Sequence, residues 1–182
     1  MELFHGSPLD MTGREDREIR TYAFLDRLGI DFERADHRDM PAVTMEACEA
    51  ADAALSVRMC KNLFLCNRQK TDFYLLIMPG GKPFKTKELS GQMGISRLSF
   101  AEENFMEEFL DIHPGSVSVL GLMNDKNRRV KLVVDEDLLK EEYFGCHPCV
   151  NTSSLKYKTK DLFEKILPTL SVTPITVRLV GE

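Results

Sequence analysis

The hydrophobic and polar positions along the chain follow helical spacing in several segments. Between residues 19 and 28 the apolar side chains recur as on one face of a helix, and Gly29 then supplies a stop signal. Thr12-Gly13-Arg14-Glu15 matches a capping box, which predicts that this helix begins there. Further helices are predicted for "MEACEAADAAL" after a Thr44 cap, "FKTKELSGQMG", "FAEENFMEEFL" and "TKDLFEKILPTL".

Strand-like segments lie between these helices. They are "IDFERADH", the two halves of "KNLFLCNRQKTDFYLLIMPGG" around a polar turn, "RVKLVVD", residues 151–157 and "PITVRLV". Strands and helices interleave, but a hairpin and tight spacings replace a regular crossover pattern. We therefore expect a mixed α/β fold of the α+β kind, with a curled mixed central sheet and surrounding helices. Since no repeat or low-complexity linker interrupts the chain, residues 1–182 are expected to form one domain.

The composition is that of an ordinary globular protein, with 43% hydrophobic and 29% charged residues among 182. The first residues lack the features of a secretory signal, and no apolar stretch approaches membrane-spanning length. Five cysteines, an odd count, suit a reducing compartment. We therefore expect a cytoplasmic protein with free thiols and no membrane contact.

The charge is unevenly distributed along the chain. The net charge of −5 argues mildly against a nucleic-acid ligand, because phosphate binding depends on Lys and Arg. Residues 58–87, however, hold seven basic residues and a single acidic one, a net charge of +6, and "KYKTK" forms a second basic cluster. This segregation suits local contact with a polyanion, and a solvated face without a partner explains it equally well.

The stretch "GCHPCVNTSS", residues 145–154, holds the most distinctive chemistry. Its C-x-x-C spacing resembles a thioredoxin-like redox motif, but β-prone and hydroxyl residues follow it where a helix is required. Structural zinc needs a second ligand pair, which the scattered cysteines do not supply. The zinc-deaminase signature is also absent, because no His in the sequence is followed two positions later by Glu. A Cys nucleophile with His147 as its base is disfavoured because adjacent residues of an extended loop point apart. No metal or other cofactor is expected.

Several dispersed motifs are recognisable as a set. "CKNLFL", "DFYLLIM", "SRLSFA", "HPGSVSVLGLMND", "RVKLVVD" and "HPCVNTSSL" occur in this order. Together they resemble the YbaK and prolyl-tRNA editing family, most closely its free-standing alanyl-tRNA(Pro) deacylase branch of the ProX or PrdX type. The resemblance covers nearly the whole chain. It departs from the family pattern at "HRDMPAVTMEA", residues 37–47, and the cysteines that flank His147 are uncommon in the family.

The resemblance implies hydrolysis of the ester that joins a wrong amino acid to the terminal ribose of tRNA(Pro). A synthetase pocket for proline cannot strongly reject a smaller residue, because each missing methylene is worth only about 1–3 kcal/mol. The family implies water attack without a metal or a covalent protein nucleophile. The implied partners are the acceptor end of tRNA(Pro) and, as a further candidate, prolyl-tRNA synthetase, and we expect a monomer or a weak homodimer.

The resemblance also assigns roles to single residues. Lys61 matches an essential family lysine that could hold the terminal phosphate or the ester oxygen. Gly115 and Ser116 belong to a Gly-led loop whose N–H groups could stabilise an oxyanion, and His147 could orient water or the amino group. Without the resemblance, the simpler interpretations are a surface side chain for Lys61, an ordinary turn for Gly115 and Ser116, and a structural role for His147. The expected substrate or tRNA contacts are Asn62, Arg97, Ser99, Val117, Ser118, Asn151, Thr152 and Ser153.

Two other function classes stay open. A non-catalytic tRNA-binding module that assists prolyl-tRNA synthetase would use the basic window but needs neither Lys61 nor the Gly115 loop. A thiol oxidoreductase would instead require Cys146 and Cys149. Within the editing family, the sequence leaves open whether alanine, cysteine or another small amino acid is removed.

Overall fold

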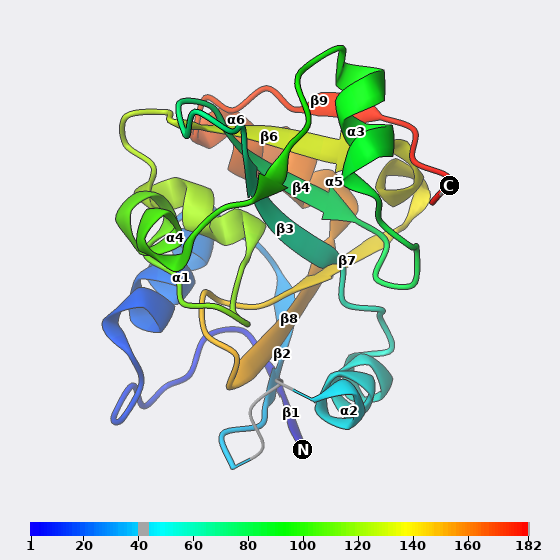
Figure 1. The fold of residues 1–182 in the computed structure, drawn as a ribbon. Coiled ribbons are helices and arrows are strands. Elements are labelled where there is room, and N and C mark those ends of the chain that lie inside the picture. The colour runs from blue at the N-terminus through cyan, green and yellow to red at the C-terminus, as the bar shows by residue number, and fades with distance from the viewer. Residues whose placement is uncertain (40–43, 182) are drawn as a thin grey trace.

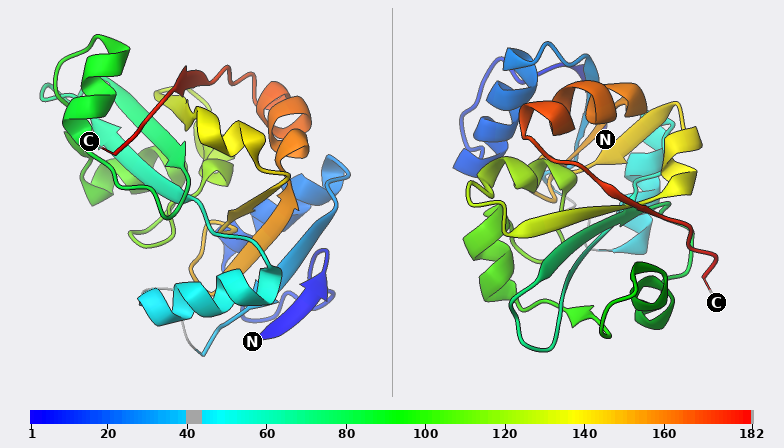
Figure 2. Two further views of the ribbon diagram at one scale, coloured as in Figure 1. Left: turned by 90° about the vertical axis from the view of Figure 1, so that its right-hand side faces the viewer. Right: turned by 90° about the horizontal axis from the view of Figure 1, so that it is seen from above.

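A computed structural model gives the structure of the protein and describes residues 1–39 and 44–181. Within these ranges nine strands form two sheets, and helices pack around them (Figures 1 and 2). Residues 40–43 of the segment that departs from the family pattern lie outside the described residues. No helix among the described residues is long and apolar enough to cross a membrane.

The first sheet is antiparallel and has the strand order β1-β2-β8-β7. Its strands are β1 (Glu2–His5), β2 (Phe32–Asp36), β8 (Ser153–Lys158) and β7 (Tyr143–Cys146). β7 and β8 are consecutive strands, so the segment "GCHPCVNTSS" begins at the end of one strand and runs into the next. The first sheet thereby fixes both ends of this segment.

The second sheet is mixed and has the strand order β5-β3-β4-β6-β9. Its strands are β5 (Ser99–Phe100), β3 (Lys61–Cys66), β4 (Phe73–Met78), β6 (Val130–Asp135) and β9 (Ile175–Val177). β3 and β4 form the predicted antiparallel hairpin, whereas β6 is parallel to both β4 and β9. All six residues of β4 are buried, as is usual for a central strand that is covered on both faces.

The two sheets meet where β3 begins. Met59 and Gly145 form an isolated parallel bridge, and the Cys60 N–H donates to the Gly145 carbonyl at 3.0 Å. A Cβ at position 145 would come within 2.7 Å of Met59 Cε, the end of a flexible side chain, and within 3.3 Å of the Arg58 carbonyl oxygen, so glycine favours this close approach. The mixed α and β class is confirmed, and the central sheet that the sequence predicts is divided into two sheets at this junction.

The helices cover the outer faces of the sheets. Figure 1 shows α2 beside β1 and β2, and α3 beside the second sheet. The α-helices are α1 (Asp16–Arg27), α2 (Met45–Leu55), α3 (Thr86–Met93), α4 (Glu103–Leu110), α5 (Thr159–Asp161) and α6 (Leu167–Thr169). A π-helical turn, η3 (Leu162–Ile166), joins α5 to α6, and two 3₁₀ helices are η1 (Val119–Asn124) and η2 (Glu136–Lys140).

The cores follow from this layering. The larger core contains buried residues of both sheets, such as Phe73 and Leu132 from the second sheet and Leu155 and Tyr157 from the first. A smaller core on the other face of the second sheet includes Leu89 of α3. Side chains of successive strand residues alternate between the two cores, because a strand has a period of two.

The helix starts show one confirmed and one wrong prediction. The Thr44 hydroxyl accepts from the Ala47 N–H at 3.2 Å and caps α2, as predicted. The capping box at Thr12 is wrong, since α1 begins at Asp16 and the Thr12 N–H instead donates to the Asp10 carboxylate at 2.9 Å. Asp10 and Thr12 form a local turn that competes with helix initiation.

Candidate active site

A cleft of about 450 Å³ opens where β3 begins, between α2, residues 113–118 and the end of β7. Five residues that the sequence predicts for the site line it, namely Lys61, Asn62, Gly115, Val117 and His147. They come from three segments that are distant in sequence. The bridge between Met59 and Gly145 brings two of these segments, the start of β3 and the end of β7, together.

Lys61 is the first residue of β3 and lines the cleft. Its Nζ donates to the Lys82 carbonyl at 2.7 Å, which fixes the side chain without neutralising its charge. Within the described part of the chain no ion pair engages this ammonium. A half-buried cation without a counter-ion is an electrostatic feature suited to an anionic or developing negative charge.

Lys82, from the same basic window of the sequence, is paired within the fold. Its Nζ contacts Asp135 at 2.7 Å and Asp137 at 2.6 Å, and it also donates to the Leu179 carbonyl. Burial alone would lower the pKa of Lys82, but the hydrogen bonds to Asp135 and Asp137 raise it. Lys82 is therefore a structural cation whose backbone carbonyl holds Lys61. The basic window as a whole does not border the cleft, and only Arg58 and Lys61 of its cations line it.

His147 enters the cleft from the end of β7, and its ring tautomer is set by the backbone. Nδ1 lies 2.9 Å from the Ser153 carbonyl, which can only accept, so Nδ1 carries the hydrogen and Nε2 is left as an acceptor. Burial lowers the pKa of His147, the bond to the Ser153 carbonyl opposes that shift, and neighbouring His37 adds to it. A neutral imidazole with a free acceptor nitrogen can orient a water molecule.

The loop at residues 115–118 divides its groups between the cleft and the interior. Gly115 has φ +83° and lines the cleft with Val117. Among the residues that the structure describes, no hydrogen bond engages the N–H of either one, so both donors can serve a ligand. Ser116 is buried and its N–H already donates to the His113 carbonyl, while the buried Ser118 hydroxyl caps η1 through the Leu120 N–H. The two serines do not line the cleft.

The amide oxygen of Asn62 is buried and has no hydrogen-bond partner among the described residues. The Asn62 Nδ2 donates to the Cys60 carbonyl at 3.1 Å, which orients the amide and leaves Oδ1 without a hydrogen-bond partner. Buried acceptors are almost always satisfied, and an exception is a sign of function. Because Asn62 lines the cleft, its oxygen can accept from a ligand donor such as an ammonium group.

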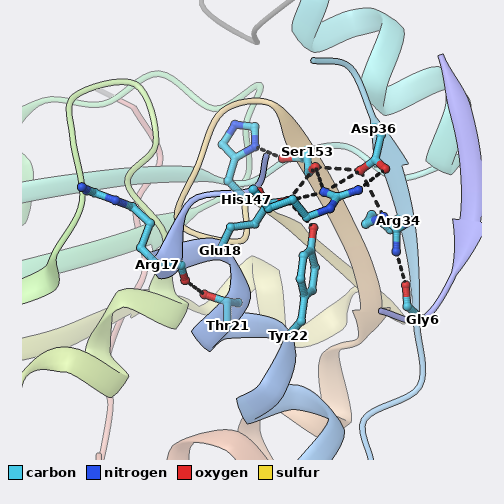
Figure 3. Close-up of polar contacts among 10 residues, drawn as sticks. Gly6, Arg17, Glu18, Thr21, Tyr22, Arg34, Asp36, His147 and Ser153 are labelled. Atoms are coloured by element: carbon cyan, nitrogen blue, oxygen red, sulfur yellow. Dashed lines mark hydrogen bonds and ion pairs between the residues drawn. The ribbon is translucent and has the colours of Figure 1, made fainter. Parts of the chain in front are cut away.

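Asn151, Thr152 and Ser153 do not line the cleft with His147. The Thr152 carbonyl accepts from the His37 N–H at 2.9 Å, and Thr152 and Asn151 are half-buried. The Ser153 side chain is fully buried, and its hydroxyl donates to Asp36 at 2.7 Å, away from the His147 ring (Figure 3). Ser153 therefore touches His147 through its carbonyl and a set of buried charges through its hydroxyl.

These charges form a cluster behind the His147 loop, which we call the buried charge cluster (Figure 3). Its members are Arg14, Glu18, Arg34 and Asp36, with the hydroxyls of Tyr22 and Ser153 attached. Arg14 bridges Glu18 and Asp36, and Arg34 reaches Asp36 at 3.0 Å. Burial alone would raise the pKa of Asp36, but hydrogen bonds from Arg14 and Ser153 lower it. The cluster ties α1 to the start of β8.

Arg97 and Ser99 lie outside the cleft. They line a second groove of about 610 Å³ beside Cys66, the last residue of β3, whereas Lys61 is the first. Of the predicted binding residues, Asn62 and Val117 thus line the cleft at one end of β3, and Arg97 and Ser99 line the groove at the other end.

Several residues that line the cleft were not predicted from the sequence. Glu49 and Asp52 come from α2, Arg58 and Cys60 precede β3, and Gly80 follows β4. Burial raises the pKa of Asp52, although its carboxylate accepts from the Met59 N–H at 2.9 Å. A side chain at Gly80 would come within 2.2 Å of the Met59 carbonyl oxygen. The paired glycines of "MPGG" were the available signal for this close approach.

The cysteines of C-H-P-C are buried and inert. Cys146 and Cys149 are each 1% exposed, and burial raises the pKa of both thiols to about 12. Both are therefore protonated at neutral pH, whereas redox chemistry requires an accessible thiolate. Neither lines the cleft. These observations weigh against a thiol oxidoreductase.

Comparison with known proteins places the chain in a family. Residues 39–165 match the aminoacyl-tRNA editing domain. The chain is 30% identical over 152 residues to the prolyl-tRNA editing protein ProX of Acetoanaerobium sticklandii, covering 84% of this chain and 91% of ProX. It is also 30% identical over 154 residues to the prolyl-tRNA synthetase associated domain-containing protein 1 of Danio rerio, covering 84% and 82% respectively.

Solved structures agree with the fold. A structure described as a candidate trans-editing enzyme for prolyl-tRNA synthetase superposes with a TM-score of 0.65 at 18% identity. The superposition covers 91% of this chain and 98% of that one. The domain match and the relatives show that this chain belongs to the aminoacyl-tRNA editing family.

Proposed function

We propose that this chain is a deacylase that hydrolyses mischarged tRNA(Pro) in trans, with Ala-tRNA(Pro) as its main substrate. The observation that carries the proposal is the convergence of Lys61, Gly115 and His147 on one cleft. The membership of the aminoacyl-tRNA editing family supports the reaction type, and the names of the relatives support proline tRNA. Residues 1–182 act as one editing domain in this proposal.

The reaction is attack of water on the ester carbonyl. His147 Nε2 accepts a hydrogen bond from the attacking water and orients it, because Nδ1 is committed to the Ser153 carbonyl. The N–H groups of Gly115 and Val117 stabilise the oxyanion of the tetrahedral intermediate. Collapse of that intermediate breaks the ester C–O bond, and the proton that His147 Nε2 takes from the water passes to the ribose oxygen, so the products are the ribose hydroxyl of the tRNA and the free amino acid. The step needs no covalent bond to the protein.

Two further residues hold the substrate. The Lys61 ammonium contacts the terminal phosphate or the ester oxygen, and it does so with full charge because no carboxylate of the described residues pairs with it. The unpartnered Asn62 oxygen accepts from the α-ammonium group of the amino acid. The name of the Danio rerio relative refers to association with prolyl-tRNA synthetase, and we propose that synthetase as a second partner.

The experiment is a panel of tRNA(Pro) charged with alanine, cysteine or proline, each incubated with purified protein and scored for release of the amino acid. We expect release of alanine above the other two and little release of proline. A protein that binds tRNA(Pro) but releases no amino acid would instead be a non-catalytic binding module. Equal release of all three amino acids would contradict an editing function.

A further inference from the structure

The second groove lies at the opposite end of β3 from the cleft. Lys61 begins the strand in the cleft, and Cys66 ends it in the groove. Five residue steps at about 3.3 Å each separate the two places by about 16 Å. A ligand confined to the cleft cannot reach the groove, but an RNA strand of a few nucleotides can span both.

The groove is strongly basic in a chain whose net charge is −5. Arg68, Lys70 and Arg97 line it, and Lys85 and Lys87 flank Thr86 in its wall. Arg68 and Arg97 are exposed, and neither has an ion-pair partner among the residues that the structure describes. The single carboxylate of the lining, Glu102, is already paired with Lys70. The uncompensated charge is therefore that of two arginines.

An exposed aromatic ring accompanies these arginines. Phe100 belongs to the edge strand β5 and is 63% exposed, although it is flanked by the buried Leu98 and by the core of the second sheet. Phe84 holds it edge-on, with ring centroids 6.3 Å apart. Basic side chains beside an exposed aromatic ring form the platform on which proteins bind single-stranded nucleic acid, because cations hold phosphates while the ring stacks on a base.

We propose that this basic groove, defined by Arg68, Arg97 and Phe100, binds the RNA strand of the tRNA some nucleotides away from the esterified end. Arg68 and Arg97 contact phosphates, and Phe100 stacks on a base. The inference rests on the proposed function, because the occupant is the same RNA whose ester lies in the cleft. Charge complementarity and the exposed ring favour RNA over an acidic protein segment, which would leave Phe100 without a stacking partner.

The test compares two substrates that differ only in their reach. Ala-tRNA(Pro) spans the cleft and the groove, whereas an alanyl ester of the terminal adenosine alone is confined to the cleft. The variants are Arg68→Ala with Arg97→Ala, and Phe100→Ala. The matched control is Arg178→Ala, because Arg178 has a side chain that is 78% exposed and lies outside both sites.

The groove variants are expected to raise KM for Ala-tRNA(Pro) by about tenfold or more and to leave kcat nearly unchanged, since stacking or phosphate contacts are lost without any change in the cleft. Both should hydrolyse the alanyl-adenosine ester like the wild type. Each lost phosphate contact should also reduce the slope of log affinity against log salt by about 0.7 to 0.9. A merely structural role would not change this slope, and Arg68→Lys with Arg97→Lys should restore most of it.

The outcomes separate this inference from the proposed function. Variants that affect both substrates equally, or neither, overturn the groove while deacylation stands. If the wild type hydrolyses neither ester, the proposed function fails, and binding of uncharged tRNA(Pro) still tests the groove through the same salt slope. Competition by poly-glutamate as strong as that by RNA of equal charge would overturn the assignment to RNA. Thermal melting of each variant checks that it is folded.

Discussion

Charged side chains lie on both sides of the His147 loop, but the two sets are paired very differently. In the buried charge cluster, Arg14 and Arg34 each contact a carboxylate. In the cleft, Arg58 and Lys61 have no ion pair within the described residues. Paired buried charges hold the fold in one arrangement, since removing a partner leaves an uncompensated charge. Cleft cations without an ion pair among the described residues can serve a ligand, so the two sets differ in what their charges are available for.

The largest expected effect is on stability, from Asp36→Asn in the buried charge cluster. Loss of the carboxylate charge leaves Arg14 and Arg34 under-compensated, and breaking a buried pair costs about 3–5 kcal/mol. Urea unfolding measures the free energy of unfolding. The matched control is Glu33→Gln, which removes the partially exposed pair with Lys156 and should cost about 1 kcal/mol or less. Equal costs for the two variants would contradict the distinction between the cluster and the surface.

The same cluster predicts a pH dependence of stability. The pKa of Asp36 is lower in the folded than in the unfolded protein, so its contribution is present above the unfolded value of about 3.9. That contribution is lost as the pH falls through the folded pKa. The Asp36→Asn variant should therefore lose less stability than the wild type between neutral and acidic pH. Parallel losses in the two proteins would contradict this assignment.

The next largest effect is on activity, from Lys61→Ala in the cleft. It should slow hydrolysis of Ala-tRNA(Pro) by at least about a hundredfold, because one well-placed electrostatic stabiliser is worth about 2.7–4 kcal/mol of the barrier. Stability should hardly change, since no ion pair of the described residues is broken. Single-turnover rates measure the first claim and urea unfolding the second. Lys165→Ala, at a half-exposed lysine on the surface, is the control and should leave the rate unchanged.

His147→Ala is expected to slow hydrolysis by about a hundredfold or more, because general-base assistance contributes on the order of a hundredfold or above. Burial places the pKa of His147 below its ordinary value of about 6.5. The neutral imidazole therefore persists at neutral pH, and wild-type activity should fall only as the pH drops through that lowered pKa. A pH profile of kcat/KM measures this fall, which the variant should lack. An unchanged acidic limb in the variant would remove the role of His147.

The smallest effect is expected from the double change Cys146→Ser and Cys149→Ser. Both thiols are buried and protonated, and they lie outside the cleft lining. Under reducing conditions the folded variant should keep its deacylation rate within about twofold, as expected for residues that contact no substrate. A folded variant that loses activity would show that the thiols take part in the reaction.

The sequence predicts the elements that bury a periodic face and misses those that do not. The β3–β4 hairpin and β6 were predicted because their apolar runs are continuous, as in strands buried on both faces. All four residues of β1 are exposed, so this edge strand has no hydrophobic pattern to detect. β7 is only four residues long, and it was read as part of the loop that it leads into.

The candidate site shows the same limit at the level of side chains. Residues at strand ends, such as Lys61 and His147, could be placed from family motifs, because their elements fix their direction. Ser118 and Ser153 lie beside predicted cleft residues in the sequence, yet both hydroxyls point into the protein. Ser118 precedes η1 and Ser153 is the first residue of β8, and hydrogen-bond partners such as Asp36 decide the direction of such hydroxyls at the ends of elements. Glu49 and Asp52 were missed because only tertiary packing brings α2 to the cleft.

We propose that the Lys61 cleft removes alanine from tRNA(Pro) and spares proline. The most direct test of this proposal is the initial rate of wild-type protein on Ala-tRNA(Pro) and Pro-tRNA(Pro), measured side by side. We predict faster hydrolysis of Ala-tRNA(Pro) by at least about tenfold, because the proline ring adds bulk around Cα and overpacking costs about 1–3 kcal/mol. Equal rates on the two substrates would contradict the account.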